Sequence, residues 1–139
     1  MNRTLFLFAT VMLFAAVSLR AQAADPATAA KSEADRSGQV LRHVVMYKFK
    51  EEVTPAELQE VIDAFAGLPK KIDTIVGFES GTNVSKEGKS EGFTHIFVVT
   101  FRDEQGLADY LVHPAHDAYV KVVRDRREKV VVFDYWADK

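Results

Sequence analysis

The sequence predicts an α+β fold whose elements follow the order strand, helix, strand, strand, helix, strand. Apolar residues recur with a period of two over residues 43–50 and 94–101, as strands that cover a core require. Helix-start signals stand at Thr54 and at Pro114. The chain has 139 residues, 47% of them hydrophobic, which is typical of a single globular core. This order is the split βαβ arrangement of ferredoxin-like domains, a four-stranded sheet with its helices on one side.

Residues 1–23 have the features of a cleaved secretory signal. An apolar run follows two polar residues, and Ala21 and Ala23 place small side chains where a signal peptidase reads the chain. The run is shorter than the roughly 18 residues that cross a bilayer, so we expect a secreted or periplasmic protein with no membrane anchor after cleavage. Residues 24–40 are small and polar and predict a flexible leader, which leaves 41–139 for the folded domain.

The composition narrows the partners and the means of stabilisation. Cleavage of the signal would remove two basic residues and no acidic ones, so the mature chain is mildly acidic and no nucleic-acid partner is expected. The glycines lack the spacing of a phosphate-binding loop, and no cofactor is expected. Because the chain has no cysteine, its stability must come from burial of an apolar core, helped by association, and not from disulfides.

The first half of the domain predicts a strand, a helix and a weaker strand. Residues 43–50 (HVVMYKFK) alternate between two faces, as a strand does. Thr54 and Glu57 flank a proline and have the spacing of a capping box, and Gly67 ends the helix that follows. Residues 75–84 predict a weaker strand, because two glycines interrupt its apolar pattern.

The second half predicts a strong strand, a helix in two parts and a closing strand. Residues 94–101 (THIFVVTF) alternate clearly, with their larger aromatic side chains on one face. Asp103 is placed to cap a short helix. Pro114 begins a second helical segment, because the residue before a proline is pushed out of the helical region. Residues 130–136 (VVVFDYW) predict the last strand.

The strands carry apolar residues on both of their faces. Ile96 and Val98 alternate with Phe97 and Val99 in the strongest of them. Helices can cover only one face of the predicted sheet, so the other face would expose a large apolar patch unless a second molecule buried it. We therefore expect a homodimer in which two sheets pack face to face.

The four histidines are the best candidates for chemistry, because histidine changes its charge near neutral pH. His113 and His116 share the segment DYLVHPAHDAY with Tyr110. His43 and His95 have the parity of the aromatic residues in their strands, so both rings point toward this segment if those faces are helix-facing. His113 resembles a helix cap, whereas His116 lies in a first helical turn, where the helix dipole favours the neutral form that a general base needs. Taken singly, each histidine also fits a satisfied core or capping residue.

Six segments between His43 and Tyr135 match, in order, the motifs of a known family: HVVMYKFK, the helix start TPAELQ, GTNVS, EGFTHIFVVTF, LADYLVHPAHDAYV and VVFDY. In these motifs the chain resembles the stress-responsive A/B barrel (Dabb) domain family. The resemblance implies a ferredoxin-like α+β fold whose dimer packs two sheets into an α/β barrel. That implication agrees with the two-faced strands.

Within that family the chain resembles a plant polyketide cyclase, which closes a linear tetraketide thioester by intramolecular aldol condensation. This resemblance implies that Tyr110 and His116 are a catalytic pair. His116 would be the general base, and Tyr110 would donate a hydrogen bond to the enolate or carbonyl oxygen. The resemblance also implies ligand-binding roles for His43, His95, Ile62 and Phe65.

Three functions remain open from the sequence. The first is an exported stress-response homodimer that binds a small apolar ligand without catalysis. The second is a cofactor-independent, polyketide cyclase-like lyase that uses Tyr110 and His116 on a polyketide-like ligand. The third is a metal site built on His113 and His116 with His43 or His95, since imidazole is a good metal ligand.

Overall fold

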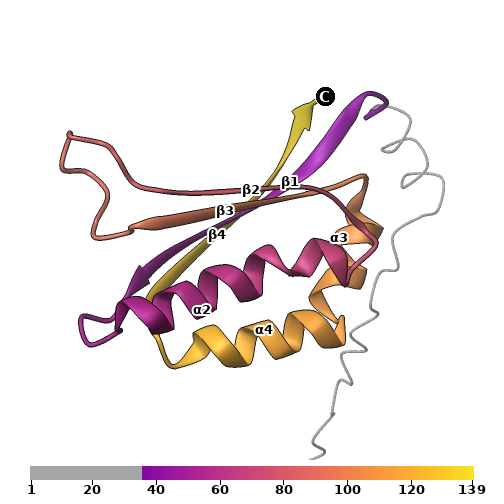
Figure 1. Ribbon diagram of the computed structural model, residues 1–139. Helices are drawn as coiled ribbons and strands as arrows, with labels where there is room; N and C mark the ends of the chain where they lie inside the picture. Colours follow the sequence, from indigo (N-terminus) through magenta and orange to yellow (C-terminus); the bar gives the residue numbers. More distant parts are fainter. Residues whose placement is uncertain (1–35) are drawn as a thin grey trace, which may run out of the picture.

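A computed structural model of the chain describes residues 36–139, in which one four-stranded sheet carries its helices on a single face (Figure 1). The predicted signal over 1–23, and the predicted leader up to residue 35, lie outside the described residues. The predicted ferredoxin-like α+β fold is confirmed. The elements are β1 (Gln39–Phe49), α2 (Pro55–Ala66), η1 (Leu68–Lys70), β2 (Ile75–Thr82), β3 (His95–Phe101), α3 (Glu104–Leu111), α4 (Pro114–Arg124) and β4 (Arg127–Asp138).

The sheet has the strand order β2-β3-β1-β4, and all neighbours are antiparallel. The predicted alternation is confirmed in β1, where His43, Val45 and Tyr47 are buried on the helix-facing side. β4 is longer than the predicted 130–136, because its pairing with β1 begins at Arg127 and continues through charged residues. The hydrogen-bond ladder, and not the apolar pattern, therefore sets the length of this strand.

The capping box at the start of α2 is present. The Thr54 side chain accepts a hydrogen bond from the Glu57 amide at 3.3 Å, and the Glu57 carboxylate accepts one from the Thr54 amide at 2.9 Å. These bonds satisfy two amide groups that have no partner inside the helix. The cap holds α2 in the orientation in which Val61 and Phe65 enter the core.

Replacing Thr54 with alanine is expected to lower the free energy of unfolding by about 1 kcal/mol, because the Glu57 amide loses its acceptor. Urea unfolding followed by circular dichroism measures the loss. Thr82→Ala, at the exposed end of β2, is the matched control and should change stability by less than about 0.5 kcal/mol. Equal losses for the two variants would show that the cap does not contribute to stability.

No helix of the described residues covers the other face of the sheet (Figure 1), and the strand register places apolar side chains there. Phe133 is 61% exposed on this side, and Tyr135 is 49% exposed. The strand register places the following apolar residues on the same side, which we call the open face: Val44, Met46, Ile96, Val98, Val131, Phe133 and Tyr135. No helix of the described residues is long and apolar enough to span a membrane.

Candidate functional site

Three predicted site residues meet where α3, α4 and β1 come together. The Tyr110 ring centroid lies 4.4 Å from that of His116 and 5.6 Å from that of His43. Tyr110 comes from the last turn of α3, His116 from the first turn of α4, and His43 from the helix-facing side of β1. Tyr110 and His43 are buried, whereas His116 is half-buried.

The turn between α3 and α4 separates the roles of its two histidines. His113 is the N-cap of α4, and its Nδ1 accepts a hydrogen bond from the Ala115 amide at 3.0 Å. His116 Nδ1 lies 3.2 Å from the carbonyl oxygen of Leu111. Because a carbonyl oxygen only accepts, Nδ1 must carry the proton, which leaves the lone pair of the neutral ring on Nε2. The prediction that His113 caps α4 agrees with its hydrogen bond from the Ala115 amide.

Burial sets the protonation states of the pair. Burial is the main cause that lowers the pKa of His116, and the nearby His43 acts in the same direction, against the Leu111 carbonyl and Asp117. The helix dipole was the predicted reason for a neutral His116, whereas desolvation is the larger cause of its lowered pKa. Burial raises the pKa of Tyr110 far above its ordinary value. At neutral pH the pair is therefore a neutral imidazole beside a protonated phenol.

Asp134 is a site residue that the sequence analysis missed. It lies directly opposite His43 in the β1–β4 ladder, and its carboxylate oxygen is 2.6 Å from His43 Nδ1. An ionised carboxylate has no proton to give, so His43 Nδ1 donates the hydrogen bond to Asp134. A single acidic residue within the apolar segment VVVFDYW was the signal that could have identified it.

Replacing Asp134 with alanine is expected to lower the free energy of unfolding by about 1 to 2 kcal/mol, because the buried Nδ1 of His43 loses its hydrogen-bond partner within residues 36–139. Chemical denaturation measures the loss, and nitrogen NMR of the imidazole reports whether the ring keeps its tautomer. Asp138→Ala removes an exposed hydrogen bond to Gln39 at the end of the same strand and is the control. If both variants lose stability equally and the tautomer persists, Asp134 does not position His43.

His95 does not lie beside Tyr110, His116 and His43. This corrects the expectation that both strand histidines point toward Tyr110. His95 pairs with Tyr47, four residues beyond His43 along β1, or about 13 Å at the rise of a strand. Its ring packs against Phe49 at 5.3 Å, and its Nδ1 bonds the Thr94 hydroxyl at 2.9 Å. It lines a separate cavity of about 340 Å³ beside the β2–β3 loop. Burial lowers its pKa.

Ile62 and Phe65 of α2, for which the resemblance implied ligand-binding roles, belong to the core. Phe65 stacks on Phe97 with ring centroids 4.4 Å apart, and Ile62 packs partly buried against the same core. The metal hypothesis finds no donor set, since the described residues contain no group of three or more histidine, cysteine or acidic side chains placed to hold an ion. His113, which that hypothesis required, uses its Nδ1 in the helix cap.

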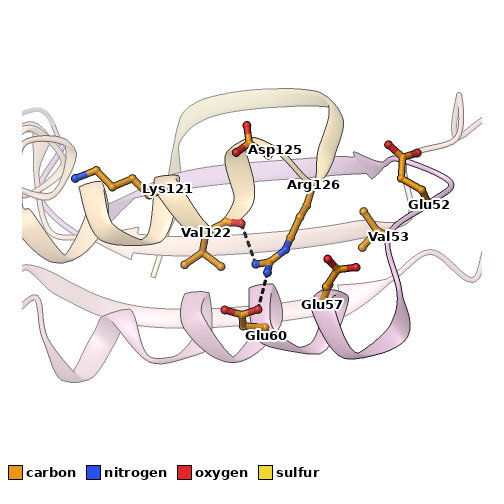
Figure 2. Close-up of a pocket in the computed structure, with 8 residues that line it drawn as sticks. All are labelled: Glu52, Val53, Glu57, Glu60, Lys121, Val122, Asp125 and Arg126. Atoms are coloured by element: carbon orange, nitrogen blue, oxygen red, sulfur yellow. Dashed lines mark hydrogen bonds and ion pairs between the residues drawn. The ribbon is translucent and has the colours of Figure 1, made fainter.

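A cavity of about 510 Å³ lies between α2 and α4, away from the predicted site (Figure 2). Arg126 reaches across it and donates to the Glu60 carboxylate at 2.6 Å and to the Val122 carbonyl at 3.0 Å. The walls mix both signs of charge, and the guanidinium already has partners in both helices. This arrangement ties α2 to α4. The lining residues are Glu52, Val53, Glu57, Glu60, Lys121, Val122, Asp125 and Arg126.

Comparison with known proteins shows the family to which the chain is similar. The profile of the family described as "Stress responsive A/B Barrel Domain" matches residues 41–137. Olivetolic acid cyclase from Cannabis sativa is 36% identical over 95 residues, which cover 68% of this chain and 94% of the cyclase. A crystal structure from Arabidopsis thaliana has 36% identity and a TM-score of 0.65, and the match covers 68% of this chain and 92% of that one. A dimeric ferredoxin-like protein from Bacteroides fragilis has 26% identity and a TM-score of 0.57, covering 69% and 94% of the two chains.

Proposed function

The chain belongs to the stress-responsive A/B barrel domain family, and from this premise we propose that it is a homodimer that binds a small carbonyl compound and removes a proton beside the carbonyl. The observation that carries the proposal is the contact between a neutral His116 and a protonated Tyr110, with ring centroids 4.4 Å apart. A base beside a hydrogen-bond donor is the pair that carbon-acid chemistry requires.

In the proposed reaction, Tyr110 donates a hydrogen bond to the carbonyl oxygen of the ligand. His116 Nε2 takes a proton from the adjacent carbon, and the electron pair of the broken C–H bond moves to form an enolate whose charge lies on that oxygen. The imidazolium then returns the proton to the enolate or to an acceptor group of the product. General-base catalysis contributes about 10² to 10⁴ in rate, and one oxyanion donor about 10² to 10³.

The second histidine supports this assignment of roles. The Asp134 carboxylate fixes the His43 ring through Nδ1, and His43 contacts Tyr110 edge to face at 5.6 Å. His43 therefore packs against the phenol ring, and Asp134 acts through His43 as a positioning residue. The relative named olivetolic acid cyclase is an enzyme by name, which supports chemistry at this site in the family.

Binding without turnover is the second candidate, and the burial of Tyr110 favours it. Only 1% of the Tyr110 side chain is exposed, so a ligand must displace neighbouring side chains to reach the hydroxyl. Leu111 and Val112, which follow it directly, are 50% and 81% exposed. An apolar compound bound against these two residues would be held beside the site without reaching the acid–base pair.

The homodimer rests on the open face. Its apolar side chains form one continuous surface on three strands, and burial of that surface by a second copy would remove it from water. The dimeric state of the Bacteroides fragilis relative supports this assembly.

Hydrogen exchange of acetone in deuterated water, followed by NMR, tests the proposed function directly. The wild-type domain should accelerate deuterium incorporation at the methyl carbons, and pentane-2,4-dione should bind competitively and develop the ultraviolet absorbance of its enolate. Binding of the diketone without accelerated exchange would favour the second candidate. If the domain neither binds the diketone nor accelerates exchange, the proposed function is wrong.

A further inference from the structure

Four aromatic side chains fill the space between helices and sheet behind the candidate site. Phe65 stacks on Phe97 at 4.4 Å and packs tilted against Tyr119 at 4.5 Å, and Tyr47 meets Phe97 edge to face at 5.9 Å. None of the four is more than 3% exposed. They come from four different elements, β1, α2, β3 and α4. We call Tyr47, Phe65, Phe97 and Tyr119 the aromatic plug.

The plug continues the buried core from the acid–base pair along α4 and β1. Tyr119 follows His116 by three residues in α4, so the two share a face of that helix. Tyr47 follows His43 by four residues in β1, on the same buried face of the strand. A ligand that extended inward from His116, between the helices and the sheet, would therefore meet the plug within about one helical turn.

A hydrogen bond holds the two tyrosines of the plug in place. The Tyr119 hydroxyl donates to the Tyr47 hydroxyl at 3.0 Å, and both are buried. Rotation of either ring away from the other would leave a buried hydroxyl without its partner. The contacts of Phe65 with Phe97 and with Tyr119 restrict the rotation of these three rings. A flexible ligand tail gains too little from burial to displace all four rings.

We propose that the aromatic plug limits the ligand to short carbonyl compounds without an alkyl tail longer than a few carbons. The inference rests on the proposed function for the identity of the head group, and it adds the size class. It narrows the polyketide-like ligand of the sequence analysis, because the four buried rings occupy the interior space that an apolar tail would need. The bulk of a ligand stays near Leu111 and Val112, on the outer side of His116.

A series of 2,4-diketones of increasing chain length, from pentane-2,4-dione to nonane-2,4-dione, tests the limit by calorimetric titration. Wild-type affinity should stay flat or fall with each added methylene. Tyr47→Leu opens space in the plug, so its affinity should rise with tail length, at most about fourfold per methylene. Tyr47→Phe keeps the ring that fills the space and removes the hydrogen bond to Tyr119, so its affinity should rise with tail length less than that of Tyr47→Leu. A wild-type affinity that rises about fourfold per methylene overturns the proposal.

Benzene binding separates this inference from the proposed function, because it needs no carbonyl head group. Benzene should leave the melting temperature of the wild type unchanged and raise that of Tyr47→Leu. If benzene raises the melting temperature of the wild type, the plug proposal is wrong even where the diketones bind. If benzene leaves that melting temperature unchanged, the plug is supported even where the diketones do not bind and the proposed function is wrong. If Tyr47→Leu does not fold, Phe97→Leu opens the same space, and the two wild-type measurements still decide the proposal.

Discussion

Replacing His116 with alanine is expected to slow the exchange of acetone methyl protons by about 100- to 10,000-fold relative to the wild type. The His116 ring lies beside Tyr110 and its Nδ1 is bound to the Leu111 carbonyl, so its Nε2 lone pair is available to take the proton. The substitution removes one half-buried ring and a single hydrogen bond, so the fold should persist. NMR measures the exchange rate, and circular dichroism of the same sample verifies the fold.

His113→Asn is the matched control for this prediction. Asparagine is a preferred N-cap residue, so the start of α4 should be preserved while an imidazole three residues from His116 is removed. This variant should exchange acetone protons at the wild-type rate. If His116→Ala and His113→Asn have equal effects, or if His116→Ala has none, the assignment of His116 as the base is wrong.

The rate of acetone exchange should fall at acidic pH, because protonation of His116 removes the base. The base must be neutral, and burial lowers the pKa of His116, so the active form persists to more acidic pH than for a free histidine, whose pKa is about 6.5. The rate should therefore be constant at neutral pH and fall about tenfold per unit below the lowered pKa. A midpoint above that of free histidine would contradict the environment described for His116.

Introducing an aspartate at Val98 is expected to convert the homodimer into a folded monomer. Val98 lies near the centre of the open face, paired with Val44 of β1, and face-to-face packing would bury the new carboxylate without a partner. Within one protomer the same carboxylate still reaches water. Analytical ultracentrifugation gives the mass in solution, and circular dichroism reports whether the monomer is folded.

Val99→Asp is the matched control, one residue along β3 and on the opposite face. Val99 is fully buried under the helices, so its replacement should unfold the domain itself and not release a folded monomer. A dimer that survives Val98→Asp would place the interface elsewhere. If the wild-type domain is already monomeric, the prediction that the open face forms a dimer interface is wrong.

Local patterns predicted the order of elements well, because they depend on residues close together in the chain. The capping box at Thr54, the aspartate cap at Asp103 and the proline start at Pro114 are all present. The ends of the strands were less predictable. β4 begins at Arg127 because it pairs with Phe49 of β1, and an apolar pattern contains no information about a partner on another strand.

The site was predicted in part for the same physical reason. Parity grouped His43 with the aromatic residues of its strand, but parity cannot give the position along the sheet, and the antiparallel register carries His95 to the other end. Asp134 was missed because its partner is 91 residues away, and only the β1–β4 register brings the two together. Distance along the chain therefore separates what the sequence could predict from what required the fold.

The central place of β1, between the last two strands to be made, has a consequence for how the domain folds. His43 receives its carboxylate partner only when β4 has docked, and the two residues close a loop that spans most of the domain. Closure of so long a loop lowers the conformational entropy of the chain before the new contacts stabilise it. We therefore expect β4 to join the sheet late, in a cooperative step. Partly folded chains then lack an oriented His43, and activity should appear and disappear together with the complete domain.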